Sequence, residues 1–180
     1  AAALASQQLR DTAGAHAFWR QLDALVPASD ATARRQSAWL GAELALAAGQ
    51  PQQALDLVER HPAPQLRPAV LLHAQAQLAL QRPALASERL QTWVTTHPQD
   101  AQAWQWLAQA WQAQNQPLRA LRAQAEAQVA IRDFSAAQDR LKAAQDLARR
   151  GGNQDHIEAS IIDTRLRAVT ELLREEARKQ

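Results

Sequence analysis

The chain has 180 residues, with 20 basic and 18 acidic side chains, a net charge of +2 and no cysteine. This length suits one domain or one array of short repeats. Basic and acidic residues are interspersed without a basic run, so no nucleic-acid partner is expected. Without cysteine the chain forms no disulfide and no thiolate zinc site. No apolar run approaches the ~20 residues of a membrane span, so none is expected.

The composition predicts an all-α protein. Alanine, leucine, glutamine and arginine are abundant and favour helices, whereas glycine occurs only 5 times. The chain contains no methionine, from which we expect an excised domain or a processed product. We also expect no targeting signal in this sequence, because Ala1–Ala5 is apolar but too short and lacks a basic start.

The N-terminal part, residues 1–30, is expected to form one helix from about Ala2 to Val26, which Pro27 ends. The spacing of its large apolar side chains predicts one buried face. That face would consist of Phe18, Trp19, Leu22 and Leu25.

Residues 31–150 are expected to form helical repeats, with turns near residues 49–54, 81–86, 115–120 and 131–137. In each of these ranges a proline, or Phe134 in the last one, marks the start of the next helix. The alanine three positions further on recurs after 32, 34 and 17 residues, at Ala54, Ala86, Ala120 and Ala137. The first two intervals match the 34-residue period of helix-turn-helix repeats, and the third is half of it. One helix, Leu118–Ile131, should therefore serve in two hairpins.

The most specific pattern begins at Asp100, a good N-cap. Large and small apolar residues follow at i, i+3, i+4 and i+7, namely Trp104, Leu107, Ala108 and Trp111, and Ala120 lies in the next helix. This pattern resembles a tetratricopeptide (TPR) repeat, W-x2-L-G-x2-Y followed by an alanine. The resemblance implies a TPR-like α-solenoid of about nine helices, which we expect to form a single domain over residues 1–180.

The last part, residues 154–178, is predicted to form a C-terminal capping helix that Asp155 starts. An array of repeats leaves an apolar end face, and a final amphipathic helix can cover it. The apolar side of this helix would consist of Ile157, Ile161, Ile162, Leu166, Val169, Leu172 and Leu173.

No catalytic constellation is found in the sequence. The five histidines are scattered, and none forms the H-E-x-x-H motif that binds zinc. We therefore predict no catalytic residue, no metal and no cofactor in this chain. Trp104 and Trp111 are expected in the core rather than on a stacking surface, whereas Trp106 lies off their stripe.

With no catalytic or metal-binding residues predicted, the remaining functional candidate is a surface that binds another protein. In TPR arrays the first helix of each repeat lines a groove, and the resemblance places the corresponding positions on two helices. Glutamine can donate and accept hydrogen bonds, so such a lining suits an extended peptide or strand with unpaired backbone groups. A chain rich in alanine and glutamine also places glutamine on any solvent-facing side, which is the alternative. The predicted groove residues are Gln102, Gln105, Gln109, Gln112, Arg119, Arg122 and Glu126.

The closing segment extends the resemblance. Glu158-Ala159-Ser160-Ile161-Ile162-Asp163-Thr164-Arg165-Leu166, preceded by Arg132-Asp133-Phe134-Ser135-Ala136-Ala137, is similar to the C-terminus of BepA-type proteins. These are periplasmic zinc metallopeptidases of Gram-negative bacteria, with an H-E-x-x-H protease domain followed by a TPR domain. The resemblance covers most of the chain from about Gln36 onward.

The BepA resemblance implies that this chain is the TPR domain of a periplasmic protease, without the zinc-binding protease half. It implies protein partners, namely the outer-membrane β-barrel assembly machinery and its client barrels, including the lipopolysaccharide-transport barrel. The alternative is a stand-alone TPR scaffold or lipoprotein accessory of an envelope assembly or secretion complex. An H-E-x-x-H motif upstream in the parent reading frame supports the first reading, and a lipobox supports the second.

Overall fold

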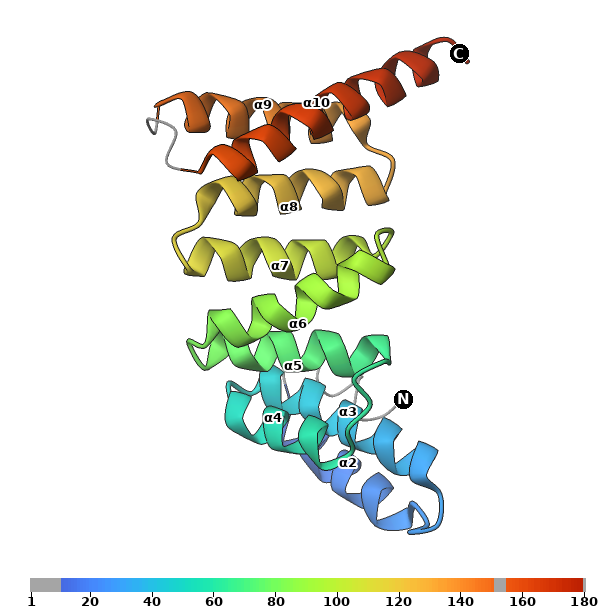
Figure 1. Cartoon of the computed structure of the whole chain (residues 1–180). Coiled ribbons are helices and arrows are strands. Elements are labelled where there is room, and N and C mark those ends of the chain that lie inside the picture. Colours follow the sequence, from blue (N-terminus) through green and yellow to red (C-terminus); the bar gives the residue numbers. More distant parts are fainter. Residues whose placement is uncertain (1–10, 151–154, 180) are drawn as a thin grey trace. The chain divides into compact units, whose positions relative to one another are not determined.

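The computed structural model describes residues 11–150 and 155–179, and every regular element in these ranges is an α-helix (Figure 1). The chain comprises two compact units, residues 1–82 and 83–180. Within each unit, helices that are adjacent in the sequence pack on one another, so the protein is an all-α helical repeat array, as predicted. The single domain expected over residues 1–180 stays a prediction. The helices are α2 (Thr12–Leu25), α3 (Ala31–Ala47), α4 (Pro51–Arg60), α5 (Arg67–Ala79), α6 (Pro83–Thr96), α7 (Ala101–Ala113), α8 (Pro117–Ala130), α9 (Phe134–Arg150) and α10 (His156–Ala177).

Local capping sets most helix starts. Aspartate side chains accept hydrogen bonds from the third amide of the helix at the starts of α2, α3, α7, α9 and α10. In α2 the cap is Asp11, whose Oδ1 lies 2.8 Å from the Gly14 amide. The described part of the expected first helix is α2, which begins at Thr12, and residues 2–10 of that expectation lie outside the described residues.

Four turns share one geometry and confirm the repeat. Each contains a residue with positive φ, followed by an amide that donates to the carbonyl five residues earlier at 2.8–2.9 Å. This is the Schellman motif, which satisfies the last carbonyls of a helix. The next helix begins two residues after the left-handed residue. These residues are Gly49 (φ 72°), Gln81 (φ 59°), Asn115 (φ 56°) and Arg132 (φ 65°), at the predicted intervals of 32, 34 and 17.

In residues 1–82, the core lies among α2, α3, α4 and α5. Trp19 joins α2 to α3, because its indole N–H donates to the carbonyl oxygen of Ser37 at 2.8 Å. The ring lies so near Gly41 that a Cβ added there would approach it to 2.4 Å. Gly41 is therefore needed for this close contact of helix and indole.

The prediction that Phe18, Leu22 and Leu25 belong to the buried face of the first helix was wrong. Phe18, Leu22 and Leu25 are exposed by 44%, 45% and 80%, whereas Trp19 and Ala15 are buried. The described part of α2 packs chiefly on one helix, α3. A single neighbour covers only a narrow strip of a helix, and the apolar stripe beside that strip stays in solvent.

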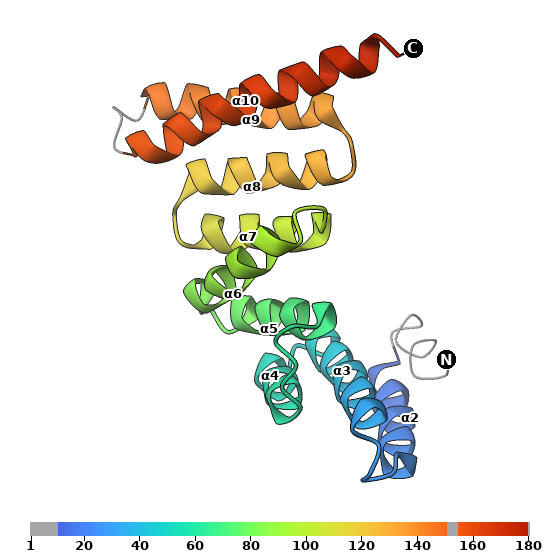
Figure 2. The same ribbon diagram turned by 45° about the vertical axis from the view of Figure 1, so that its right-hand side comes forward.

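In residues 83–180, α8 is the central helix, with α7 packed on one side and α9 on the other (Figures 1 and 2). Ala125 belongs to the core shared with α9, together with Phe134 and Leu141. The buried Ala120 and Ala123 lie on the opposite side of α8, toward α7. The helix predicted over Leu118–Ile131 thus serves in two hairpins, as expected.

The final helix, α10, covers this end of the array. It lies along α9 in both views and also meets α8 (Figure 2). Ile162 and Val169 are fully buried in the core with α9, in agreement with the predicted capping helix. Ile157 and Ile161, predicted on the same apolar side, are exposed by 77% and 38%.

Candidate protein-interaction surface

Helix α7 exposes one row of amide side chains. At about 100° per residue the four predicted glutamines fall within an arc of about 80°. Ala103, Leu107 and Ala110 are buried on the other side of the helix. We call this row the glutamine face, and it consists of the exposed residues Gln102, Gln105, Gln109 and Gln112.

The helix under the glutamine face is held at both ends. The Asp100 carboxylate accepts a hydrogen bond from the Ala103 amide at 3.2 Å, and Asn115 forms the Schellman turn that ends α7. The glutamine face thus presents its side chains from a capped and packed helix. Each carboxamide carries two donors and one acceptor oxygen, so the row can bond a partner of either polarity.

The tryptophans of α7 differ in burial. Trp111 is only 8% exposed, which confirms its core position, and the guanidinium of Arg119 lies 5.1 Å from its ring centroid. Trp104, also predicted in the core, is only half-buried, and its indole N–H donates to the carbonyl of Pro98 at 3.0 Å. Trp106 is half-buried as well, with an indole N–H that finds no acceptor among the described residues.

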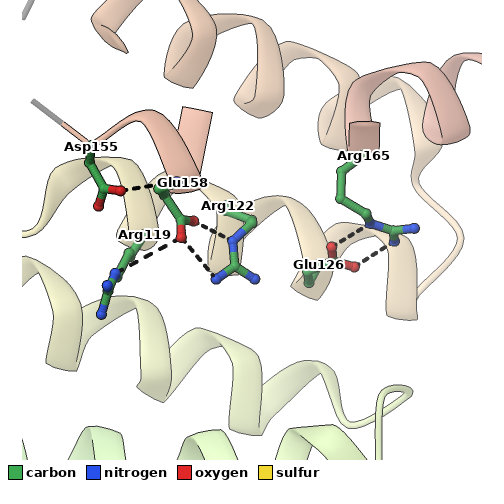
Figure 3. A network of polar contacts seen from close by, with 6 residues as sticks. All are labelled: Arg119, Arg122, Glu126, Asp155, Glu158 and Arg165. Carbon is green, nitrogen blue, oxygen red and sulfur yellow. Dashed lines mark hydrogen bonds and ion pairs between the residues drawn. The ribbon is translucent and has the colours of Figure 1, made fainter. Parts of the chain in front are cut away.

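The three charged residues predicted to line the groove from α8 instead face α10 (Figure 3). Glu126 accepts from Arg165 through both carboxylate oxygens, at 2.6 Å from Nε and 2.6 Å from Nη2. Arg122 donates to Glu158 from Nε, and its Nη2 lies 3.4 Å from the other carboxylate oxygen. Arg119 makes a longer ion pair, with 3.9 Å between its Nε and Oε2 of Glu158.

Arg122 and Glu126, which were predicted to line an open groove, instead belong to the packed contact between α8 and α10. The Glu158 side chain is only 4% exposed, and that of Glu126 13%. Ion pairs with such low exposure cannot lose one partner without stranding the other charge. The prediction failed because the side of α8 assigned to an open groove is the side on which α10 packs. Any role of these residues in binding stays a prediction.

The pairs form a complementary charge pattern between two helices. Along α8 the order is two positive charges and then a negative one, and along α10 it is Glu158 and then Arg165. Because both helices run in the same direction, each charge meets its opposite. The hydrogen bond to Glu126 raises the pKa of Arg165 above its ordinary value, and the nearby negative charge adds to this effect against the desolvation that lowers it. The pattern specifies the register of α10 on α8.

Sequence reasoning missed Glu158 and Arg165 as functional partners of α8, although the sequence held a signal. At 100° per residue, Glu158, Ile162, Arg165 and Val169 share one side of α10. Opposite charges seven residues apart on a side that is otherwise apolar indicate partners on another helix. Which helix carries those partners is not readable from the spacing.

The described helices define an α-solenoid, that is, an array of helical hairpins. A scan of the sequence against protein-family models and a search of curated proteins found no match, so the BepA resemblance stays a prediction. In residues 11–150 and 155–179, no helix is long and apolar enough to cross a membrane. Nor do three or more His, Cys, Asp or Glu side chains gather there in a way that could hold a metal ion.

Proposed function

We propose that this chain is a protein-interaction domain rather than an enzyme, and that the glutamine face of α7 binds an extended segment of a partner protein. The observation that carries the proposal is the row of four exposed glutamines on a helix whose other side is packed. An extended segment exposes backbone N–H and C=O groups, and carboxamides can bond to both. The side chains need no cofactor for this.

The BepA resemblance supplies the biological setting of the proposal. According to this resemblance, the chain is the TPR domain of a periplasmic metalloprotease or chaperone, and zinc belongs to the protease domain of the parent protein. The partners are the outer-membrane β-barrel assembly machinery and its client barrels. A parent reading frame with a lipobox and no H-E-x-x-H motif would instead identify a stand-alone scaffold of an envelope complex.

The test replaces two adjacent members of the glutamine face, Gln105→Ala and Gln109→Ala, in one variant. Each lost hydrogen bond is worth about 0.5–1.5 kcal/mol, so binding should weaken about tenfold. Both residues are exposed, and the melting temperature should stay nearly unchanged. Titration with a fragment of the assembly machinery or of a client barrel measures the affinity. Thermal melts of the same samples measure the melting temperature.

The matched control is Gln53→Ala, which removes an exposed glutamine from α4. Its affinity for the same fragment should equal that of the wild-type chain. If the double variant binds as tightly as this control, the glutamine face is not the binding surface.

A further inference from the structure

Helix α8 has one side that no other described helix covers. The sides toward α7 and α9 carry its buried alanines, and the side toward α10 carries Arg119, Arg122 and Glu126. At 100° per residue, Gln124 and Gln128 lie on the fourth side, opposite Glu126. Both are only half-buried.

This fourth side of α8 continues the glutamine face of α7. On α7, Gln112 lies about 100° round the helix from Trp111, which faces α8. On α8, Gln124 and Gln128 lie about 40–80° round the helix, in the same sense, from Ala120, which faces α7. In an antiparallel pair of right-handed helices, such rotations lead to the same side of the pair. The α10 side, with Arg119, Arg122 and Glu126, lies about 100–160° round in the opposite sense.

The combined surface carries no formal charge. Helix α7 contains no ionisable side chain at all, and the three ionisable side chains of α8 all lie on the α10 side. Such a surface offers a charged ligand no opposite charge. The complementary ligand is a neutral one that bonds through amide donors and acceptors.

We propose that the binding surface crosses from α7 onto α8 through Gln124 and Gln128, and that its occupant is an uncharged extended strand recognised by its backbone amides. This inference rests on the proposed function and specifies its partner. An extended chain advances about 3.3 Å per residue, and neighbouring helix axes lie about 8–10 Å apart. About three residues therefore lead from one helix to the next, and a strand of about six residues contacts both.

The experiment compares two double variants of the full chain, Gln124→Ala with Gln128→Ala and Gln105→Ala with Gln109→Ala. The probe is a neutral eight-residue peptide with the sequence of one strand of an outer-membrane β-barrel. A second peptide of the same sequence is N-methylated at alternate residues, which removes the N–H donors along one edge. The control variant combines Gln53→Ala and Gln65→Ala, two exposed glutamines of residues 1–82.

Both double variants should bind the unmodified peptide about tenfold more weakly than the wild-type chain, since each loses about two hydrogen bonds. The N-methylated peptide should lose affinity for the wild-type chain by a similar factor. Because no charge is involved, the affinity should change less than about twofold between about 0.05 and 0.5 M salt. The control variant should bind like the wild-type chain.

The outcomes separate this inference from the proposed function. If only the α7 variant weakens binding, the surface does not extend onto α8, and the proposed function stands. If neither variant weakens binding, both proposals are overturned. Equal binding of the N-methylated peptide, or a steep loss of affinity with salt, contradicts recognition through backbone amides.

Discussion

Glu158 holds a carboxylate that is almost completely removed from solvent, between the guanidinium groups of Arg119 and Arg122. A buried ionised carboxylate is tolerated only where opposite charges and hydrogen bonds surround it. Its backbone amide also donates to the Asp155 cap at 3.0 Å, and its position in the first turn of α10 suits a negative charge. One residue therefore ties the start of α10 to α8.

The role of Glu158 can be tested by Glu158→Gln. Loss of the charge leaves Arg122 without its carboxylate partner, and we expect the free energy of unfolding to fall by about 1–3 kcal/mol. This is less than the about 3–5 kcal/mol for breaking a fully buried pair, because the Arg122 side chain is 23% exposed. Urea denaturation measures the change. Glu175→Gln, at an exposed position of the same helix, is the control and should stay within about 0.5 kcal/mol. Equal losses in both variants would mean that this pair does not hold α10.

At the scale of an element, α8 shows how small residues allow one helix to serve in two hairpins. Ala120 on one side and Ala125 on the other are almost completely buried, with exposures of 0% and 1%. Alanine permits close contact on both sides, since larger side chains would push the neighbouring helices away. The third side is left for ion pairs with α10.

This packing predicts that Ala120→Leu and Ala137→Leu each destabilise the protein by about 1–3 kcal/mol, the usual cost of overpacking a core contact. Both alanines are fully buried, at the α7–α8 and α8–α9 contacts respectively. Ala113→Leu, at the exposed last residue of α7, is the matched control and should change stability by less than about 0.5 kcal/mol. Thermal melts of the three variants decide the matter. Unchanged melting temperatures for Ala120→Leu and Ala137→Leu would contradict the observed helix contacts.

At the scale of the whole molecule, the described helices form two units, each with its own core. In repeat arrays each helix contacts only its near neighbours, so stability is local and damage need not spread. Residues 1–82 depend on the contact of Trp19 with α3, whereas residues 83–180 depend on the core around Leu141 and on the ion pairs of α10.

Trp19→Ala tests this locality. Loss of a buried tryptophan should cost about 3–5 kcal/mol. Amide hydrogen exchange, followed by mass spectrometry, should speed up in α2 and α3 and remain at the wild-type rate in α9 and α10. The same acceleration in α9 and α10 as in α2 and α3 would show that the array unfolds as one cooperative unit.

The helices and their turns were predictable from the sequence, because they depend on residues close together in the chain. Asp100 and Asp155 cap α7 and α10 through bonds to amides three residues on. Pro51 and Pro117 begin α4 and α8, and the turns before them close through a bond spanning five residues. Among the site residues, the exposed glutamines of α7 were also predictable, because a strong apolar stripe on one side of that helix leaves the other side polar.

Which sides of α2 and α8 are covered depends on contacts between helices that lie far apart in the sequence. Phe18 and Leu22 have the spacing of core residues, yet among the described helices α2 packs chiefly on α3, which leaves them exposed. From the sequence of α8 alone, its charged residues look solvent-facing. In the structure α10 packs on them, and the partner of Glu126 is Arg165, 39 residues further along the chain. Helix starts, helix ends and the repeat could be read along the chain, since those interactions are local. Burial of a given side depends on helices that return from far along the chain, and no local pattern specifies which helix returns to it.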